Sequence, residues 1–160
     1  GKLDLQKIAV AGHSYGGSTA MVAVHKDERI KACAVLDSWL SPVPEPIISA
    51  GIHVPFLFMG RPTWEGSDYP GNYIRLDSLM AHSSEPKYRM VIKNTLHQDY
   101  TDIPLFSPII GYVMQVGDLS PEISLTLINR LTHGFLDKHL LGRNGKKFDQ
   151  ILMNDLIIRF

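Results

Sequence analysis

The sequence predicts an α/β fold built on a mostly parallel sheet. Four apolar runs of strand length alternate with segments of helical character, and this alternation is typical of strands joined by crossover helices. The length of 160 residues fits one domain. We therefore assign residues 1–160 to a single domain and expect a C-terminal tail at 141–160 whose structure the pattern does not specify.

The strands are predicted where apolar residues run without interruption, as they do in strands buried on both faces. The first run ends at Gly12, and the fourth precedes a short polar turn. The predicted strands are 7–11, 30–36, 54–59 and 88–93.

Helices are predicted between and after these strands. Small residues allow a helix over 16–25 to lie close to the sheet, and a second helix fits 73–81. Between the second and third strands, three prolines predict a loop, because each proline fixes φ and removes a backbone donor. These prolines are Pro42, Pro44 and Pro46.

The longest helix is predicted over 121–140. Ser120 suits the N-cap and Pro121 the first helical position. Apolar residues then recur along one face: Ile123, Leu127, Leu131 and Phe135. A shorter helical pattern covers 109–115, and residues 148–160 show no clear period.

The composition excludes several classes of protein. Basic and acidic residues number 16 each, so the net charge is zero. A global positive field that could hold nucleic acid or an anionic bilayer is therefore absent, and we expect no nucleic-acid partner. Cys33 is the single cysteine, which excludes a disulfide scaffold. No apolar run approaches the roughly 18 residues of a membrane-spanning helix.

The strongest chemical signal is the sequence Gly-His-Ser-Tyr-Gly-Gly at residues 12–17. It fits the G-x-S-x-G pattern, in which a sharp strand-to-helix turn exposes a nucleophilic serine, here Ser14, in an α/β-hydrolase fold. The pattern follows an apolar strand and precedes a small-residue helix, as such a turn requires. We expect Gly12 and Gly16 to be necessary because a Cβ at either position would collide with the adjoining strand or helix.

A nucleophilic serine needs a base, and the base needs an orienting acid. In this fold the acid follows the serine in the chain and the histidine follows the acid. Asp37 directly follows the second predicted strand, at the carboxyl edge where catalytic loops gather. Glu65 and Asp68, in the loop after the third strand, are competing candidates on position alone.

His97 is the predicted base because it follows the fourth strand in a loop. The other histidines precede the acid, begin a strand or lie on predicted helices: His13, His25, His53, His82, His133 and His139. The sequence has neither a zinc-type histidine pair on one helix face nor a Walker-type phosphate loop. We therefore predict neither a metal nor another cofactor.

Three motifs together resemble the platelet-activating-factor acetylhydrolases of the plasma and intracellular type II group, also called lipoprotein-associated phospholipase A2. They are residues 12–17, Leu-Asp-Ser-Trp at 36–39 and His-Gln-Asp-Tyr at 97–100. The Leu-Asp-x-Trp element, at its distance from the serine, is far more specific than G-x-S-x-G. It favours Asp37 over Asp68 as the acid, and the resemblance runs from about residue 8 to residue 140.

The resemblance implies calcium-independent hydrolysis of the sn-2 acyl ester of phospholipids. Family substrates carry acetyl, short or oxidatively truncated chains, platelet-activating factor among them. Ser14 would attack the ester and form an acyl-enzyme, with His97 as base and Asp37 holding His97 in the required tautomer. The backbone N–H of Tyr15 would be one oxyanion donor.

The same resemblance implies residues for the pocket and for a lipid surface. Trp39 and Gln98 would line the pocket, although a packed aromatic ring and a polar residue at a helix start are equally good interpretations. The apolar spacing within 109–115 fits a core-facing helix by default, whereas the matching family segment docks on lipoprotein or membrane lipid. The candidate lipid-facing residues are Ile109, Ile110, Val113 and Met114.

The resemblance covers only the C-terminal half of the hydrolase sheet, from the nucleophile strand onward. The chain opens without Met or a signal region, and we expect it to be the interior of a longer protein. Earlier strands and the loop with the second oxyanion N–H are then missing. The first strand would be an exposed edge, and the chain alone could be inactive. The sequence specifies neither a secreted nor a cytoplasmic location.

Two alternatives to a phospholipid acylhydrolase stay open at this stage. One is a general carboxylesterase or a dienelactone-hydrolase-like enzyme on the same fold. The other is a non-catalytic lipid-binding remnant that keeps the motifs. Comparing the hydrolysis of short esters with and without a glycerophospholipid head group distinguishes a phospholipid acylhydrolase from a general esterase. Labelling of Ser14 by an organophosphate distinguishes an enzyme from a non-catalytic remnant.

Overall fold

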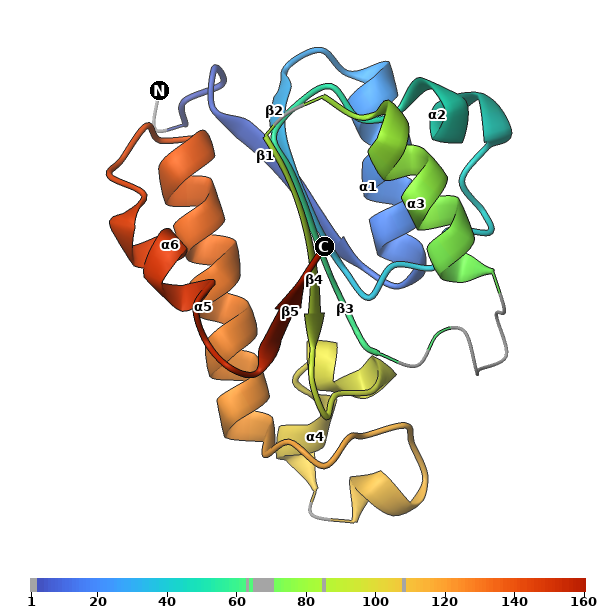
Figure 1. Cartoon of the computed structure of the whole chain (residues 1–160), viewed down its shortest axis with the longest axis vertical. Coiled ribbons are helices and arrows are strands. Elements are labelled where there is room, and N and C mark those ends of the chain that lie inside the picture. Colours follow the sequence, from blue (N-terminus) through green and yellow to red (C-terminus); the bar gives the residue numbers. More distant parts are fainter. Residues whose placement is uncertain (1–2, 63, 65–70, 85, 108) are drawn as a thin grey trace.

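A single sheet runs through the centre of the molecule (Figure 1). The computed structural model describes residues 3–62, 64, 71–84, 86–107 and 109–160. Within them, five strands lie side by side in chain order: β1 (Ile8–His13), β2 (Ile30–Leu36), β3 (Phe56–Gly60), β4 (Lys87–Ile92) and β5 (Ile157–Arg159). Strands β1 to β4 are parallel and β5 is antiparallel to β4. The predicted parallel α/β architecture is confirmed.

Helices cover both faces of this sheet (Figure 1). On one face lie α1 (Tyr15–Lys26), α2 (Glu45–Ala50) and α3 (Asn72–His82). On the other lie α5 (Pro121–His139) and α6 (Lys146–Ile151). Each face has its own hydrophobic cluster, with Phe56 and Phe58 of β3 in one and Leu57 and Met59 in the other. Because both faces are covered, β3 is buried along its whole length, which explains its unbroken apolar sequence.

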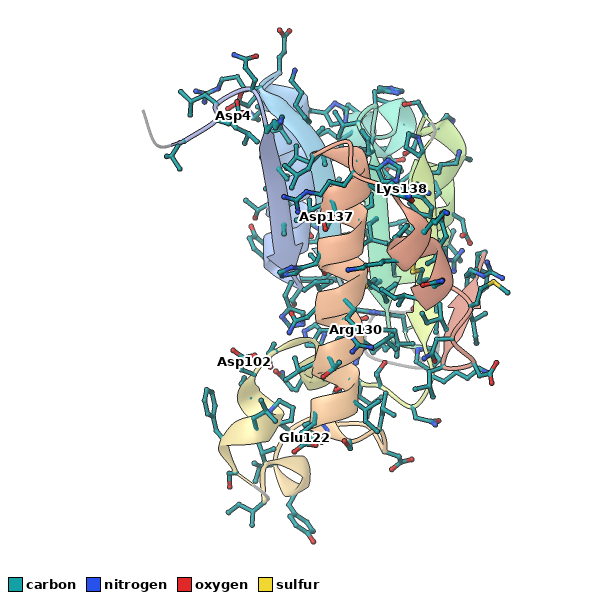
Figure 2. The ribbon with its side chains drawn as sticks, turned by 90° about the vertical axis from the view of Figure 1, so that its left-hand side faces the viewer. Asp4, Asp102, Glu122, Arg130, Asp137 and Lys138 are labelled. Carbon is teal, nitrogen blue, oxygen red and sulfur yellow. The ribbon has the colours of Figure 1, made fainter. Side chains whose placement is uncertain are left out.

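Helix α5 crosses one face of the sheet, as Figure 2 shows. The Ser120 side chain accepts a hydrogen bond from the Ile123 N–H at 3.4 Å, and Pro121 begins the helix, so the predicted start is confirmed. Leu131 and Phe135 are fully buried against the sheet. Each such side chain contributes about 1.5–3 kcal/mol by leaving water. Ile123, the first member of the predicted stripe, is half exposed instead.

Two segments are more ordered than the sequence pattern indicates. The proline-rich loop contains α2, with Pro44 at the N-cap and Pro46 inside the first turn, where a missing N–H costs nothing. The C-terminal tail forms α6 and then β5. Phe148 of α6 is buried beside Gly134 of α5, so this tail is part of the second hydrophobic cluster.

The segment after β4 crosses the carboxyl end of the parallel strands (Figure 1). It contains η1 (His97–Tyr100), α4 (Ile103–Phe106) and η2 (Ile110–Tyr112). The predicted helix over 109–115 is wrong, because only a three-residue 3-10 turn forms there. Its default interpretation as a core-facing helix is also wrong, since Ile109 is 67% exposed and Val113 77%. In the described part of the chain, α4 contacts this turn but leaves Ile109 and Val113 largely exposed.

Strand β1 forms one edge of the sheet in the described residues, since it pairs with β2 alone. Its residues are mostly half-buried, because α1 packs against one of its faces. The expectation of an exposed edge at the first strand is therefore confirmed. No helix in the described part of the chain is both long and apolar enough to cross a membrane.

Candidate active site

The turn between β1 and α1 holds Ser14 in an unusual backbone conformation. Ser14 has φ 56° and ψ −124° at the N-cap of α1, a region that L-residues rarely occupy and that costs about 1–3 kcal/mol. The surrounding backbone holds it there. The Ser14 N–H donates to the Leu36 carbonyl at 3.0 Å, and its own carbonyl accepts from the Trp39 N–H at 3.2 Å. The serine turn is thereby joined to the end of β2.

The glycines of the turn differ in what they permit. A Cβ on Gly12 would lie 2.2 Å from the Gly16 carbonyl oxygen, so the expected need for glycine at position 12 is confirmed. The same expectation for Gly16 is wrong, because a Cβ there would meet nothing within 4 Å. The second close approach is at Gly17, whose Cβ would lie 2.6 Å from the Ser38 side chain. The second position that requires glycine is therefore Gly17 and not Gly16, because α1 passes close to the turn after β2 at Gly17.

Asp37 is fully buried directly after β2 and has φ 40°. Its Oδ2 accepts a hydrogen bond from His97 Nδ1 at 2.6 Å. Its Oδ1 accepts from the backbone N–H of Arg61 at 3.1 Å and from Trp64 Nε1 at 2.6 Å. Both carboxylate oxygens are thus engaged by donors from loops that follow β3 and β4. The competing candidates, Glu65 and Asp68, lie outside the described residues.

His97 begins η1 and connects Asp37 to Ser14. Its Nε2 lies 3.0 Å from Ser14 Oγ. An ionised carboxylate can only accept, so the contact with Asp37 requires the proton on Nδ1 in neutral His97. Nε2 is then free to accept the hydroxyl proton of Ser14. The three residues that the sequence singles out therefore form one continuous hydrogen-bonded chain, of the kind that activates a serine nucleophile.

His13, the residue before the serine, packs against His97. The two ring centroids are 4.5 Å apart, and His13 Nε2 lies 3.1 Å from the His97 carbonyl oxygen. Burial, followed by the neighbouring His97, lowers the pKa of His13. A neutral His13 that donates from Nε2 stabilises the backbone of the His97 turn.

A cavity of about 240 Å³ opens over these groups. The predicted pocket residues Trp39 and Gln98 both line it, together with Ser14, Arg61, Trp64, His97 and Gln115. Their contact with a substrate stays a prediction. Tyr15 is the first residue of α1, so its backbone N–H is one of the first-turn amides without a partner inside the helix. This position fits the predicted oxyanion donor.

The predicted lipid-facing residues do not line this cavity. They lie in the loop around η2, where Ile109, Val113 and Met114 are exposed and Ile110 is half-buried. A larger groove of about 980 Å³ lies between α5 and α6 and includes none of the three hydrogen-bonded residues. Within the described residues, no three His, Cys, Asp or Glu side chains cluster as metal ligands would.

Sequence reasoning missed three side chains of the site: Arg61, Trp64 and Gln115. Arg61 carried a usable signal, because it directly follows β3 just as Asp37 directly follows β2, and polar residues at the carboxyl ends of parallel strands gather at one edge. Trp64 and Gln115 carried none, since their approach depends on the paths of two loops.

A comparison with protein families identifies the chain. The model of the family described as platelet-activating factor acetylhydrolase, isoform II, matches residues 1–155. The chain belongs to this family. The sequence resemblance is therefore confirmed.

The chain is 35% identical over 150 residues to the platelet-activating factor acetylhydrolase of Bos taurus and 33% identical over 150 residues to that of Canis lupus familiaris. Each match covers 92% of this chain and 32% of the relative. The chain thus spans about a third of the length of these relatives.

Among solved structures, the chain is similar to a ferulic acid esterase from Streptomyces cinnamoneus. The TM-score is 0.79 at 22% sequence identity, and the match covers 99% of this chain and 48% of the esterase. This likeness shows the fold alone. Together with the parallel sheet and its helices, it confirms the predicted α/β-hydrolase fold.

Proposed function

We propose that this chain carries the catalytic centre of a serine hydrolase that cleaves the sn-2 acetyl or short or oxidised acyl ester of phospholipids such as platelet-activating factor. The observation that carries the proposal is the hydrogen-bonded chain from Ser14 through His97 to Asp37, open to a cavity. Membership of the platelet-activating factor acetylhydrolase family supports the substrate class.

In the proposed reaction, Ser14 Oγ attacks the ester carbonyl while His97 Nε2 takes its proton. Asp37 stabilises the resulting imidazolium through the 2.6 Å contact with Nδ1. The Tyr15 N–H donates to the developing oxyanion. His97 then gives the proton to the departing lysophospholipid oxygen, which leaves an acyl-enzyme. A water molecule, deprotonated by His97, then attacks the acyl carbon. The bond to Ser14 Oγ breaks, His97 returns the proton to Oγ, and the carboxylic acid leaves.

Calcium independence follows from this assignment of roles. In the proposed reaction, His97 activates the nucleophile and backbone N–H donors stabilise the oxyanion, so neither step requires a metal ion. The cavity of about 240 Å³ beside Ser14 is small for a ligand site. It is better matched to an acetyl or other short acyl group than to a long chain.

We further propose that the loop around η2 contacts the lipid surface from which the substrate is taken. Its apolar side chains include Ile109, 67% exposed, and Val113, 77% exposed. An exposed apolar group of this kind at the end of the molecule that bears the site supports contact with a membrane or lipoprotein.

The test is hydrolysis of a short-chain sn-2 ester phospholipid with EDTA present. It compares the full natural chain that carries these residues with the 160-residue chain, each beside a Ser14→Ala control. We expect turnover in the full natural chain that disappears in the control. Turnover in the 160-residue chain as well would show that these residues suffice.

Two other outcomes would replace the proposal. Equal turnover of simple short-chain esters without the glycerophospholipid head group would indicate a general carboxylesterase. A folded full natural chain that neither hydrolyses esters nor reacts with a fluorophosphonate at Ser14 would leave a non-catalytic lipid-binding protein.

A further inference from the structure

Besides His97, the Asp37 carboxylate has a second side-chain neighbour, the guanidinium of Arg61. Arg61 Nε lies 3.2 Å from Asp37 Oδ2, the same oxygen that His97 contacts. The Arg61 side chain is 4% exposed and Asp37 is fully buried. Nε makes no aligned hydrogen bond to the carboxylate, so the contact is mainly one of charge. At this distance and burial, the guanidinium charge acts strongly on the carboxylate.

Three groups hold the Arg61 side chain and backbone in place. Its guanidinium carbon lies 4.1 Å from the centre of the Trp64 ring, a cation–π geometry. Its NH1 donates to Gln115 Oε1 at 2.7 Å. The Tyr73 hydroxyl donates to its backbone carbonyl. Trp64 also donates to Asp37 Oδ1 at 2.6 Å, so arginine and tryptophan hold the two oxygens of one carboxylate.

Gln115 connects Arg61 to η1, the short helix that begins with His97. Its side chain accepts from Arg61, and its backbone carbonyl accepts from the Gln98 N–H at 3.0 Å. Gln98 follows His97 directly in η1. Gln115, an exposed residue, thus contacts both Arg61 after β3 and Gln98 in η1.

We propose that Arg61, held by Trp64 and Gln115, is a positioning residue that orients the Asp37 carboxylate and weakens its hold on a protonated His97. This proposal depends on the function proposed above. Asp37 stabilises the imidazolium formed at His97, whereas the nearby guanidinium repels it. Arg61 and Asp37 therefore act on an imidazolium at His97 with opposite sign. His13, whose ring centroid lies 4.5 Å from that of His97, faces the same ring and is unchanged in every variant below.

The first test is the pH dependence of Ser14 labelling by a fluorophosphonate and of ester hydrolysis, in the full natural chain. In Arg61→Gln, removal of the charge favours the imidazolium, so the acidic limb of both profiles moves to higher pH by about one unit. On the plateau, a less well oriented Asp37 lowers kcat by about 10- to 100-fold with little change in KM.

Two further variants separate charge from packing. Arg61→Lys keeps the charge but loses the planar fork, so it restores the acidic limb while kcat stays low. Gln115→Glu keeps an acceptor for Arg61 and neutralises its charge from an exposed position. Gln115→Glu should therefore move the acidic limb of the pH profile to higher pH, as Arg61→Gln does, but by a smaller amount. Gln150→Glu adds the same charge on exposed α6, away from the site, and leaves the profile unchanged.

The double variant Arg61→Gln with Gln115→Glu shows whether the glutamate acts through the arginine. If it does, the double variant has the profile of Arg61→Gln, because coupled substitutions are not additive. Fully additive shifts would instead indicate a direct effect of the glutamate on His97. Should Arg61→Gln fail to fold, a folded Gln115→Glu that keeps the wild-type profile still overturns the proposal, because it neutralises the Arg61 charge without removing the side chain.

Two negative results have different meanings. A wild-type chain that is never labelled at Ser14 contradicts the proposed function. A wild-type chain that is labelled, together with a folded Gln115→Glu and a folded Arg61→Gln that both keep the wild-type profile, overturns only the role of Arg61.

Discussion

Two regions at the carboxyl end of the sheet are built in opposite ways. The turns that carry Ser14, Asp37 and His97 are tied to one another by hydrogen bonds, and Asp37 is completely buried. The loop around η2 has a single short turn and leaves Tyr112 89% exposed and Val113 77% exposed. Both regions are part of the segments that follow parallel strands. They differ in whether other groups hold them.

The difference fits the roles proposed above for the two regions. The three hydrogen-bonded residues have partners that fix their geometry before any substrate arrives, which is what nucleophilic catalysis needs. The apolar loop has side chains whose burial awaits an external surface. Substitutions in the first region should therefore change activity or folding, whereas those in the second should change neither in the absence of lipid.

The largest effect is expected at Asp37, the proposed acid of the site. Asp37→Asn should lower kcat by about 10⁴-fold, because an amide supports the wrong tautomer of His97. Asp77→Asn is the matched control, since Asp77 lies on α3 and pairs with Arg89 at the surface. It should leave kcat unchanged in the same steady-state assay. An Asp37→Asn variant that keeps most of its activity would show that another residue is the acid.

The next effect concerns the glycines of the serine turn. Gly12→Ala should reduce the free energy of unfolding by about 1–3 kcal/mol or more, because its Cβ meets backbone at 2.2 Å. Gly16→Ala has open space and should leave stability unchanged or raise it by up to about 1 kcal/mol, since alanine favours the helix. Denaturant titration of both variants measures the contrast. Equal losses would show that the turn tolerates neither residue.

Much of this first region could be predicted from the sequence. The hydrogen bonds that join Ser14, Asp37 and His97 fit the sequence prediction, because each of these positions follows from a short motif or from the end of a strand. Arg61 directly follows β3 and was overlooked despite this signal, whereas Gln115 could not be predicted because its approach to Arg61 depends on a loop path that no local pattern encodes. The prediction of a helix over 109–115 was wrong for another reason. Apolar spacing reports a shared face but not whether anything covers it, and in the described residues nothing covers Val113.

A smaller effect on folding is expected in the apolar loop. Replacing Ile109 and Val113 together by Ser should change the free energy of unfolding by less than about 0.5 kcal/mol, because both are largely exposed. The same double variant should bind phosphatidylcholine vesicles more weakly and hydrolyse soluble esters normally. Leu127→Ala, in the α5 core, is the contrasting variant and should cost about 2–5 kcal/mol.

Either of two results would contradict this prediction. A loss of stability in the double serine variant as large as that of Leu127→Ala would make the loop part of the core. Unchanged vesicle binding in cosedimentation would remove lipid contact from its role.

The smallest effect is the response of stability to acid. The pKa of His13 is lowered in the folded chain by burial and by His97, so the unfolded chain binds that proton more readily. Stability should therefore fall as pH drops through about 6.5. His13→Asn should reduce this fall, whereas exposed His53→Asn should not. Burial also lowers the pKa of His139, so part of the fall in stability should remain in His13→Asn. An unchanged slope in His13→Asn would exclude His13 as a source.

The left-handed backbone at Ser14 has a consequence for evolution and engineering. Glycine adopts such a conformation without the penalty that a Cβ imposes. Selection for thermal stability alone would therefore favour glycine at position 14 and would remove the proposed nucleophile in doing so. Screens that score only heat resistance should recover this exchange, and each recovery would mark a position where stability and chemistry make opposite demands.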